Sequence, residues 1–248
     1  MQYDSLPSTN ELARQMAAQG ATEGTIIVAR EQTSGRGRLG RSWASAAGEG
    51  LYVSIILRPK VPPRQFSIMT LASAVAVAET LASAFAVSPD IKWPNDVMVS
   101  DRKICGILLE TASDGDRLEY AVLGIGVNLS QRTFPDGLLE IATSLFLESG
   151  RVVEPEDFLP PLLERLQHWY AIAVNSPREC VSRWEKMSTY AYSCPVRVIS
   201  AGAVIEGTTA GLSEGGSLMV RLPNGDIQEI ASGEISIRKL DDAARSLT

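Results

Sequence analysis

The loop from Gly35 to Trp43, which reads GRGRLGRSW, contains the residue types that bind an anionic ligand. Its glycines allow the backbone to approach a ligand closely and to adopt positive φ angles. Arg36, Arg38 and Arg41 carry rigid forks of donors that suit carboxylates and phosphates. Trp43 adds a flat apolar face on which a ring can stack. Because ordering such a loop alone costs conformational entropy, we predict that it is mobile until an anion binds.

The same loop matches the G-x-G-x-x-G pattern of dinucleotide-binding proteins, and its sequence context argues against that interpretation. In those proteins the pattern opens a helix, and an acidic residue follows about 20 positions later at the end of the next strand. Here the loop leads into the strand-like run LYVSIIL, and no Asp or Glu lies between Glu49 and Glu79. A phosphate-binding P-loop is excluded as well, since no Gly-Lys-Ser/Thr follows. The loop taken alone could therefore equally be a solvated basic turn.

A second group of polar residues lies at KWPND, from Lys92 to Asp96. Proline removes a ladder donor and the Asn and Asp side chains favour turns, so the segment is expected at a strand end. There Lys92, Asn95 and Asp96 would project into a site. Lys103 follows the expected hairpin tip at residues 100–102 and can reach back toward the same place. By spacing alone, however, a charged turn residue is the better interpretation of Lys103.

The segment GIGVN ends a strongly apolar strand pattern at Asn128. A polar residue there is either a turn starter or a donor in a site. Gly124 and Gly126 alternate on one face of that strand and would leave room for a flat ligand. Cys105, between Lys103 and Gly106, is interpreted as a small buried apolar residue and not as a nucleophile.

Composition excludes several classes of protein. With 45% hydrophobic and 21% charged residues among 248, the chain has an ordinary globular composition. A net charge of −6 argues against a nucleic acid as its main partner. Its three cysteines form no CxxC pair, so neither a disulfide framework nor a zinc knuckle is indicated. A histidine-dependent triad would rest on His168, which we interpret as a partly buried helix residue.

The sequence predicts a cytoplasmic protein that does not enter a membrane. Its N-terminus is polar and shows no secretory signal. The apolar stretch at residues 68–87 carries Thr70, Ser73, Glu79, Thr80 and Ser83, and many of its apolar residues are small alanines. A buried core helix is therefore expected there.

Hydrophobic periodicity and turn residues predict an α+β domain followed by short strands. Ser8 and Glu11 have capping-box spacing and open a helix that ends near Gly20. We also expect strands at residues 24–30 and 51–57, a core helix, a strand–turn–strand segment at 90–110, a strand at 120–129, and helix at 154–187. In the last segment, Pro160 and Pro161 are expected to limit where the first helix begins.

After Ser193 the pattern changes to five short strands. Turn residues separate them at Ala201-Gly202, Gly215-Gly216, Asn224-Gly225 and Ser232-Gly233. Such closely spaced strands indicate a small barrel or sandwich. We therefore predict a catalytic domain at residues 1–190 and a C-terminal domain at residues 191–248.

Taken together, the motifs resemble those of biotin–protein ligases of the bacterial type. They appear in family order over nearly the whole chain, as STN at residues 8–10, GRGRLGRSW, KWPND, DRKICGIL, GIGVN and the terminal GEISIR. The resemblance implies a catalytic domain like that of class II aminoacyl-tRNA synthetases, with a mixed or antiparallel sheet and helices, and an SH3-like C-terminal β-barrel. Some members of the family carry an N-terminal winged helix that binds DNA. Because the STN motif begins at Ser8, we expect a ligase without that domain.

The resemblance implies a two-step reaction that uses ATP and Mg²⁺. Biotin is first activated to biotinyl-5′-AMP with release of pyrophosphate. The ε-amine of a lysine on a biotin carboxyl carrier protein domain then takes the biotinyl group. A homodimer joined at a strand edge is common in the family.

The resemblance also implies roles for individual residues, with Lys103 and Arg38 as the catalytic pair. Lys103 would bridge the biotin carboxylate and the α-phosphate. The biotin side would consist of Ser8, Thr9, Asn10, Gln32, Gly35, Arg36, Gly37, Arg38, Lys103, Gly106, Gly124 and Gly126. The ATP or adenylate side would consist of Arg38, Arg41, Trp43, Lys92, Asn95, Asp96, Lys103 and Asn128, with Asp96 acting through Mg²⁺.

Three other functions are weighed against this one. A lipoate or octanoate ligase would share the fold and the chemistry but should lack the arginine-rich loop together with KWPND. A biotin-responsive transcriptional regulator is disfavoured because no DNA-binding domain is expected. A non-catalytic module, with the C-terminal barrel docking a peptide, would bind ligands without releasing pyrophosphate.

Overall fold

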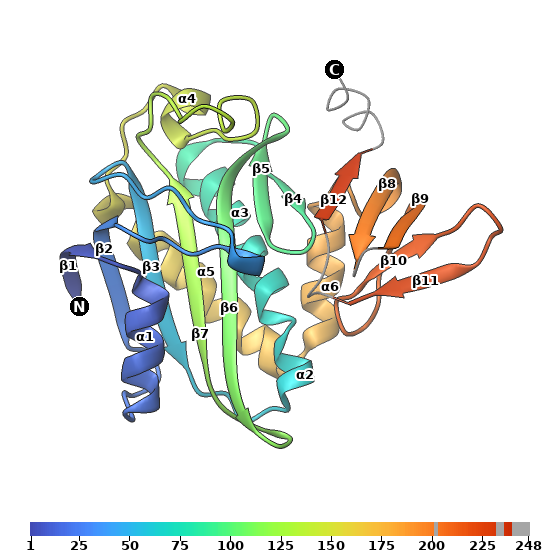
Figure 1. Cartoon of the computed structure of the whole chain (residues 1–248), viewed down its shortest axis with the longest axis horizontal. Helices are drawn as coiled ribbons and strands as arrows, with labels where there is room; N and C mark the ends of the chain where they lie inside the picture. Colours follow the sequence, from blue (N-terminus) through green and yellow to red (C-terminus); the bar gives the residue numbers. More distant parts are fainter. Residues whose placement is uncertain (201–202, 232–235, 240–248) are drawn as a thin grey trace.

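A seven-stranded mixed sheet forms the framework of the N-terminal half in the computed structural model, which describes residues 1–200, 203–231 and 236–239 (Figure 1). The strand order is β1-β2-β3-β7-β6-β5-β4, with β1 parallel to β2 and each of the other pairs antiparallel. The strands are β1 (Gln2–Leu6), β2 (Ile26–Gln32), β3 (Gly50–Leu57), β4 (Asp90–Lys92), β5 (Asp96–Val99), β6 (Arg102–Asp114) and β7 (Arg117–Asn128). The expected mixed sheet is confirmed.

Strand β3 lies at the centre of the sheet's packing because both of its faces are covered. All eight of its residues are buried. Ile56 packs with Ala13 and Ala17 of the helix α1 (Thr9–Ala18), whereas Val53 and Ile55 belong to the larger core on the opposite face. A strand covered on both faces is expected to read as a continuous apolar run, as LYVSIIL does.

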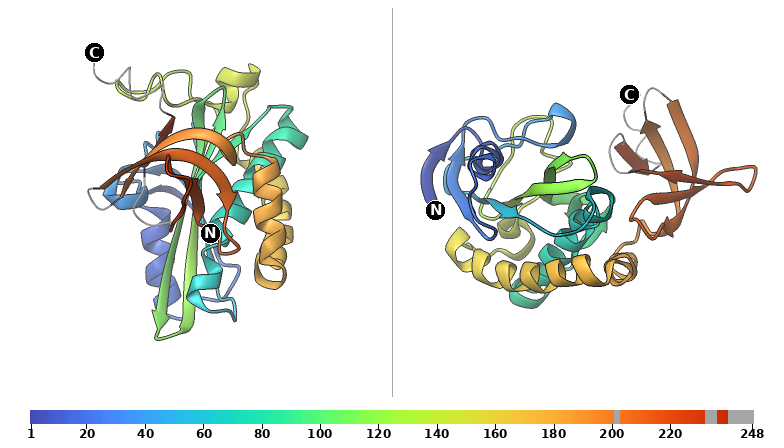
Figure 2. Two further views of the ribbon diagram at one scale, coloured as in Figure 1. Left: turned by 90° about the vertical axis from the view of Figure 1, so that its right-hand side faces the viewer. Right: turned by 90° about the horizontal axis from the view of Figure 1, so that it is seen from below.

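Helices cover the two faces of the sheet unequally. Figure 2 shows α1 on one side, with α3 (Met69–Phe85) and α5 (Pro155–Asn175) on the other. The short helices are α2 (Pro63–Phe66) and α4 (Leu145–Ser149), and α6 (Pro177–Lys186) leads to the C-terminal strands. The expected N-cap of α1 at Ser8 is confirmed, because Ser8 Oγ accepts a hydrogen bond from the Glu11 amide at 3.4 Å. The Glu11 side chain does not complete a capping box, since its carboxylate pairs with Arg14.

The apolar segment at residues 63–85 is a core helix of this fold, as expected. By length and composition alone, Pro63–Phe85 could cross a membrane, with a mean hydropathy of 1.6. However, 72% of its most apolar stretch is buried against the rest of the protein. Helix α3 packs on α5, α6 and strand β6, which accounts for its apolar surface.

Two elements differ from the sequence-based expectations. Strand β1 was not predicted, because QYDSL is largely exposed at the sheet edge and lacks alternation. Helix α5 begins at Pro155, before Pro160 and Pro161, so the expected limit on its start is wrong. Pro155 can begin the helix because proline is favoured at the first helical position. Packing then stabilises the turn that contains the later prolines, since the buried Phe158 stacks on Phe85 with 5.1 Å between ring centres.

The C-terminal segment forms a separate antiparallel sheet of five strands, as the turn pattern predicted. Its order is β11-β10-β9-β8-β12, and it is open in the described residues, with β11 and β12 at its edges. The strands are β8 (Tyr192–Ser200), β9 (Ala203–Leu212), β10 (Leu218–Arg221), β11 (Ile227–Ile230) and β12 (Ser236–Lys239). The expected turns at Gly215-Gly216 and Asn224-Gly225 are present, with φ of 83° at Gly216 and 92° at Gly225. Those at Ala201-Gly202 and Ser232-Gly233, and part of GEISIR, lie outside the described residues.

The C-terminal sheet is attached to the segment KWPND through Trp93. The buried Trp93 indole donates a hydrogen bond from Nε1 to the Gly216 carbonyl at 2.9 Å. A Cβ atom at Gly216 would lie 2.8 Å from Leu71 Cδ1, so this turn fits closely against α3. Nearby, Ser188 Oγ donates to the Ile91 carbonyl at 2.6 Å. The turn after β4 is therefore held from the C-terminal side of the molecule.

We predict that Trp93→Phe lowers the free energy of unfolding by about 1–3 kcal/mol, because it leaves the buried Gly216 carbonyl without its donor. Urea unfolding measures the change. Val152→Ala, at a side chain that is 59% exposed, is the control and should change stability by less than about 0.5 kcal/mol. Equal stability of Trp93→Phe and the parent protein would contradict this link.

Candidate active site

A pocket lies on the α1 side of the sheet. Next to it, the loop at residues 35–43 crosses in front of β6 (Figure 1). The residues that line it come from the start of α1, the loop, and strands β3, β6 and β7. Predicted site residues in the lining are Ser8, Thr9, Asn10, Gln32, Arg36, Gly37, Arg38, Trp43, Asn95, Lys103, Gly106, Gly124 and Gly126. Segments as distant in sequence as Ser8 and Gly126 thus meet at one place.

The floor of the pocket consists of glycines on adjacent strands. Gly106 of β6 is paired in register with Gly126 of β7. A Cβ atom at Gly126 would lie 2.5 Å from Trp43 Nε1, and one at Gly106 would lie 2.9 Å from Trp43 Cζ3. The indole of Trp43 therefore occupies the space above Gly106 and Gly126, where the sequence analysis expected room for a flat ligand at Gly126. Trp43 Nε1 is buried and has no hydrogen-bond partner among the described residues.

A third glycine gives room to Asn10. A Cβ atom at Gly124 would lie 2.1 Å from Asn10 Oδ1, which no neighbouring atom could tolerate. Asn10 Oδ1 accepts a hydrogen bond from Ser54 Oγ at 2.6 Å, and Ser54 is fully buried on β3. The Asn10 amide is thus pressed against the backbone of β7.

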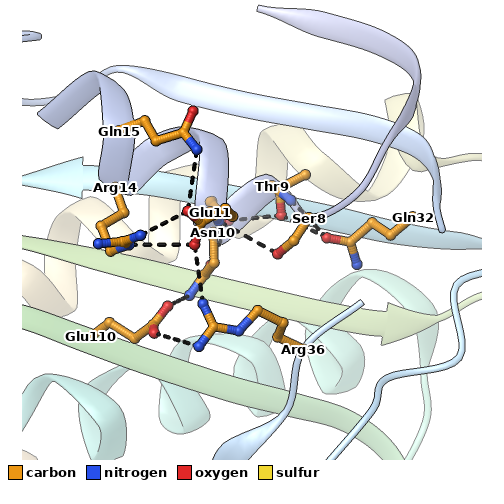
Figure 3. A network of polar contacts seen from close by, with 10 residues as sticks. Ser8, Thr9, Asn10, Glu11, Arg14, Gln15, Gln32, Arg36 and Glu110 are labelled. Carbon is orange, nitrogen blue, oxygen red and sulfur yellow. Dashed lines mark hydrogen bonds and ion pairs between the residues drawn. The ribbon is translucent and has the colours of Figure 1, made fainter. Parts of the chain in front are cut away.

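The beginning of α1 is attached to strand β2 by Gln32 (Figure 3). The backbone amide and the hydroxyl of Thr9 both donate to Gln32 Oε1, at 2.8 and 3.1 Å. Gln32 Nε2 donates in turn to Ser45 Oγ at 2.9 Å. Because α1 is also capped by Ser8, its first turn is a rigid part of the pocket wall.

Two cationic side chains of the lining meet at KWPND. Lys103 Nζ lies 2.6 Å from Asp96 Oδ1 and 5.3 Å from the centre of the Trp43 ring. Arg38 donates from Nη1 to Asn95 Oδ1 at 3.1 Å, and Asn95 is fixed by a bond to the Ile107 carbonyl at 2.8 Å. Burial lowers the pKa of Arg38, and nearby Asp96 opposes that shift. An arginine retains its proton even so, which gives the pocket two cations held in fixed positions.

Some predicted site residues lie outside the pocket lining. Gly35 is buried at the base of the loop, where a Cβ atom would lie 2.4 Å from the Trp43 carbonyl oxygen. Arg41 is exposed, and its carbonyl accepts from the Gly37 amide at 2.7 Å. The loop thus closes on itself through its own backbone.

Lys92, Asp96 and Asn128 also lie outside the lining. Lys92 Nζ lies 5.4 Å from the centre of the Tyr190 ring, and Asp96 reaches the pocket through its ion pair with Lys103. Asn128 is buried and donates from Nδ2 to the Thr143 carbonyl at 2.9 Å. The amide of Asn128 therefore contacts the segment around Thr143, outside the pocket lining.

Five lining residues were not predicted from the sequence, namely Tyr52, Val53, Ile107, Leu108 and Ile125. They are ordinary strand residues, and only their pairing next to the glycines brings them to the pocket. Tyr52 of β3 is paired with Gly126, for example. Glycines at alternate positions of β7 were the available signal, but the register that selects Tyr52 is not visible in the sequence.

Cys105 and His168 take no part in the pocket. Cys105 is buried, and burial raises the pKa of its thiol, so it is not a thiolate at neutral pH. His168 lies on α5 and is exposed, which corrects the expectation of a partly buried side chain. Leu162, Leu166 and Trp169 form the buried side of that helix, and His168 falls between them on the outer side.

Comparison with known proteins gives consistent matches. The sequence profile of the biotin/lipoate A/B protein ligase family matches residues 3–128, and that of the biotin protein ligase C terminal domain matches residues 195–238. The bifunctional ligase/repressor BirA of Bacillus spizizenii is 34% identical over 239 residues, which cover 94% of this chain and 72% of that protein. The biotin–[acetyl-CoA-carboxylase] ligase of Paracoccus denitrificans is 31% identical over 92% of this chain and 96% of its own length.

A similar arrangement of the chain exists among solved structures. The biotin protein ligase from Aquifex aeolicus, in complex with biotin and ATP, superimposes with a TM-score of 0.83 at 31% identity. The match covers 96% of this chain and 98% of that chain. The similarity therefore extends over both sheets of the chain.

We predict that Gly126→Ala displaces Trp43 from the sheet, because the new methyl group would lie 2.5 Å from Trp43 Nε1. Quenching of tryptophan fluorescence by acrylamide should increase. The same substitution in a Trp43→Phe background should leave quenching unchanged, which assigns the signal among the four tryptophans. Gly215→Ala is the steric control, since its Cβ would lie 3.8 Å from the nearest atom. Unaltered quenching in Gly126→Ala would contradict the position of Trp43.

Proposed function

The chain belongs to the biotin protein ligase family, and from that premise we propose that its pocket activates biotin with ATP and transfers it to a protein lysine. The observation that supports this most directly is the placement of Lys103 and Arg38 beside a glycine floor. A carboxylate and a triphosphate repel each other, and two fixed cations bring them together. No histidine lies in the lining among the described residues, and the proposed chemistry needs none.

In the first step, a biotin carboxylate oxygen attacks the α-phosphorus of ATP. A new P–O bond forms, the bond to the β-phosphate oxygen breaks, and pyrophosphate leaves. Negative charge builds up on the α-phosphate oxygens in the transition state, where preorganised donors stabilise it most strongly. Lys103 would bridge the carboxylate and the α-phosphate, and Arg38 would close over them from the loop.

Binding of these anions requires an exchange of partners. Lys103 is paired with Asp96, and Arg38 with Asn95, in the structure described here. When the carboxylate and the phosphate arrive, the two cations would turn from these partners to the reacting oxygens. The free protein thus keeps its cations neutralised and in place, which lowers the cost of orienting them.

In the second step, the ε-amine of the acceptor lysine attacks the acyl carbon of biotinyl-5′-AMP. A C–N bond forms, the bond from carbon to the phosphate oxygen breaks, AMP leaves, and the amine loses its proton. The acceptor is a biotin carboxyl carrier protein domain, in keeping with the carboxylase named for the Paracoccus relative. Until that lysine arrives, the loop at residues 35–43 would retain the adenylate.

The remaining predicted residues are assigned to two sides of the pocket. Ser8, Thr9, Asn10 and Gln32, with Gly35, Arg36, Gly37, Gly106, Gly124 and Gly126, form the biotin side. Trp43, Asn95 and Asp96 form the adenylate side, to which the motif resemblance alone adds Arg41, Lys92 and Asn128. The residues that line the pocket are best placed to contact biotin or the adenylate. For Arg41, Lys92 and Asn128, such a contact is predicted only from the motifs.

The residues present fit a magnesium ion that arrives with ATP. No group of three or more His, Cys, Asp or Glu side chains in the described part of the chain could hold a metal by itself. Magnesium commonly binds through one or two carboxylates together with substrate phosphates, and Asp96 at the pocket edge offers such a carboxylate. When bound there, the ion would neutralise phosphate charge and so aid attack at phosphorus.

The domain organisation, the cellular location and the oligomeric state of the protein are inferred from the same resemblance. We divide it into a catalytic domain at residues 1–190, of the class II aminoacyl-tRNA synthetase type, and an SH3-like domain at residues 191–248. Its place of action is the cytoplasm, and a second copy would join it as a homodimer at a strand edge. Because its net charge is −6, we expect no nucleic-acid partner. A gel shift with biotin-operator DNA in the presence of biotin and ATP tests for DNA binding.

The experiment that tests the proposed function is exchange of labelled pyrophosphate into ATP. Biotin should support exchange, whereas lipoate or octanoate at the same concentration should support little. The family also includes lipoate ligases, so a reversed preference would assign the chain to them instead. Absence of exchange with any of the three acids would refute ligase activity.

We predict that Lys103→Ala slows the adenylation step about 100- to 1,000-fold, a loss of about 3–4 kcal/mol in transition-state stabilisation. The fold should survive, because Lys103 is 30% exposed and its ion pair with Asp96 contributes little to stability. Lys60→Ala, at an exposed position away from the pocket, is the control. If Lys103→Ala adenylates biotin near the parent rate in a single turnover, Lys103 does not bridge the carboxylate and the α-phosphate. Lys92 would then be the next cation to test.

A further inference from the structure

The glycine-rich loop is attached to the pocket wall by a carboxylate that no motif includes. Arg36 of the loop lies between two acidic side chains from different elements, as Figure 3 shows. Its Nη1 is 3.2 Å from Glu11 Oε2 of α1, and its Nη2 is 3.4 Å from Glu110 Oε1 of β6. The loop is therefore connected to the helix on one side of the pocket and to the sheet below it.

Glu110 has a second contact that Glu11 lacks. Its other oxygen, Oε2, accepts a hydrogen bond from Asn10 Nδ2 at 2.9 Å. An ionised carboxylate can only accept hydrogen bonds, so it selects the amide nitrogen of Asn10 and turns Oδ1 toward Ser54 and Gly124. Glu110 thus determines which end of the Asn10 amide points along the pocket floor.

Glu11 supplies the comparison. It pairs with Arg14 at 2.7 Å, accepts from Gln15 at 3.2 Å, and also contacts Arg36. The hydrogen bond from Arg14 is the largest cause that lowers the pKa of Glu11, so its carboxylate is charged at neutral pH. Among the hydrogen bonds of the described residues, none joins the Glu11 side chain to that of Asn10, so Glu11 contacts the loop but not the amide on the floor.

We propose that Glu110 is a positioning residue that couples the closure of the loop to the orientation of Asn10. The kinetic consequences of this inference rest on the proposed function. The ion pairs of Arg36 with Glu11 and Glu110, here called the tether, belong to the free chain. Glu110 is 26% exposed and Arg36 is 48% exposed, so their ion pair contributes little to global stability. Its consequence is local, because one carboxylate fixes two parts of the pocket that would otherwise move independently.

Three variants separate the two contacts. Glu110→Gln keeps an acceptor for Asn10 but removes the charge that holds Arg36. Glu110→Ala removes both contacts. Glu11→Gln weakens only the loop contact, and Glu164→Gln, at an exposed position on α5, is the matched control for the loss of one negative charge.

The first measurement is limited trypsin digestion of the free, full-length proteins, which needs no ligand. Cleavage after Arg36, Arg38 or Arg41 should be about two- to fivefold faster in Glu110→Gln and Glu11→Gln, as loss of an exposed ion pair predicts. Glu164→Gln should match the parent protein. Equal cleavage rates in all four proteins would overturn the tether, whether or not the chain proves to be a ligase.

The second measurement separates KM from retention of the intermediate. Glu110→Ala should raise the KM for biotin about tenfold, the lower range for a lost hydrogen bond to a charged group. Glu110→Gln should restore a KM near that of the parent but still release biotinyl-5′-AMP about two- to fivefold faster, as should Glu11→Gln. A purely structural role would lower the melting temperature without this split. Equal KM values for Glu110→Gln and Glu110→Ala would overturn the coupling to Asn10, and absence of pyrophosphate exchange in the parent protein would refute the proposed function only.

Discussion

The pairing of Gly106 with Gly126 is the constraint on which the rest of the site depends. On a sheet face, side chains project at every second residue, and a ligand can reach the backbone only where they are missing. Two strands that each place glycine at the same level create such a gap. Trp43 and Asn10 are arranged around it, since each would collide with a Cβ atom at one of these glycines or at Gly124, and Lys103 Nζ would lie 3.2 Å from a Cβ atom at Gly106.

The electrostatics of the pocket follow from this floor of glycines. Cations that are to meet anions on a sheet must come from its rim, and here they come from the loop and from the start of β6. Each is kept in place by a partner, Asp96 for Lys103 and Asn95 for Arg38. Arg36 is held by Glu11 and Glu110 in the same way. A site with an excess of unpaired cations would spread its side chains into solvent, whereas these pairs keep them near the floor.

The position of Asn95 and Asp96 depends in turn on the far side of the molecule. KWPND turns at the edge of the sheet, between β4 and β5, where few neighbouring strands could hold it. Trp93 extends from this turn into the core and donates a hydrogen bond to the Gly216 carbonyl, in the turn between β9 and β10 of the C-terminal sheet. The second sheet thus contributes to the pocket without lining it, by fixing the segment that holds both cations.

Features that depend on neighbours along the chain could be predicted from the amino-acid order alone. The cap of α1 at Ser8, the apolar runs of β3 and β7, the core helix and the five C-terminal strands all follow from local propensity, hydrophobic period and turn chemistry. The pocket's polar residues were found because their motifs occur in family order. Tertiary structure decided what depends on register and on distant contacts. Strand register pairs Tyr52 with Gly126, and packing places Trp43 against the glycines. Distant contacts join Asn128 to the Thr143 carbonyl, and Glu110 to Asn10, a hundred residues away. Tertiary contacts also explain two features that the sequence did not predict. These are the strand β1 at the sheet edge and the start of α5 ahead of its prolines. In each case packing energy from residues remote in sequence outweighs a weak local preference, and no local pattern carries that information.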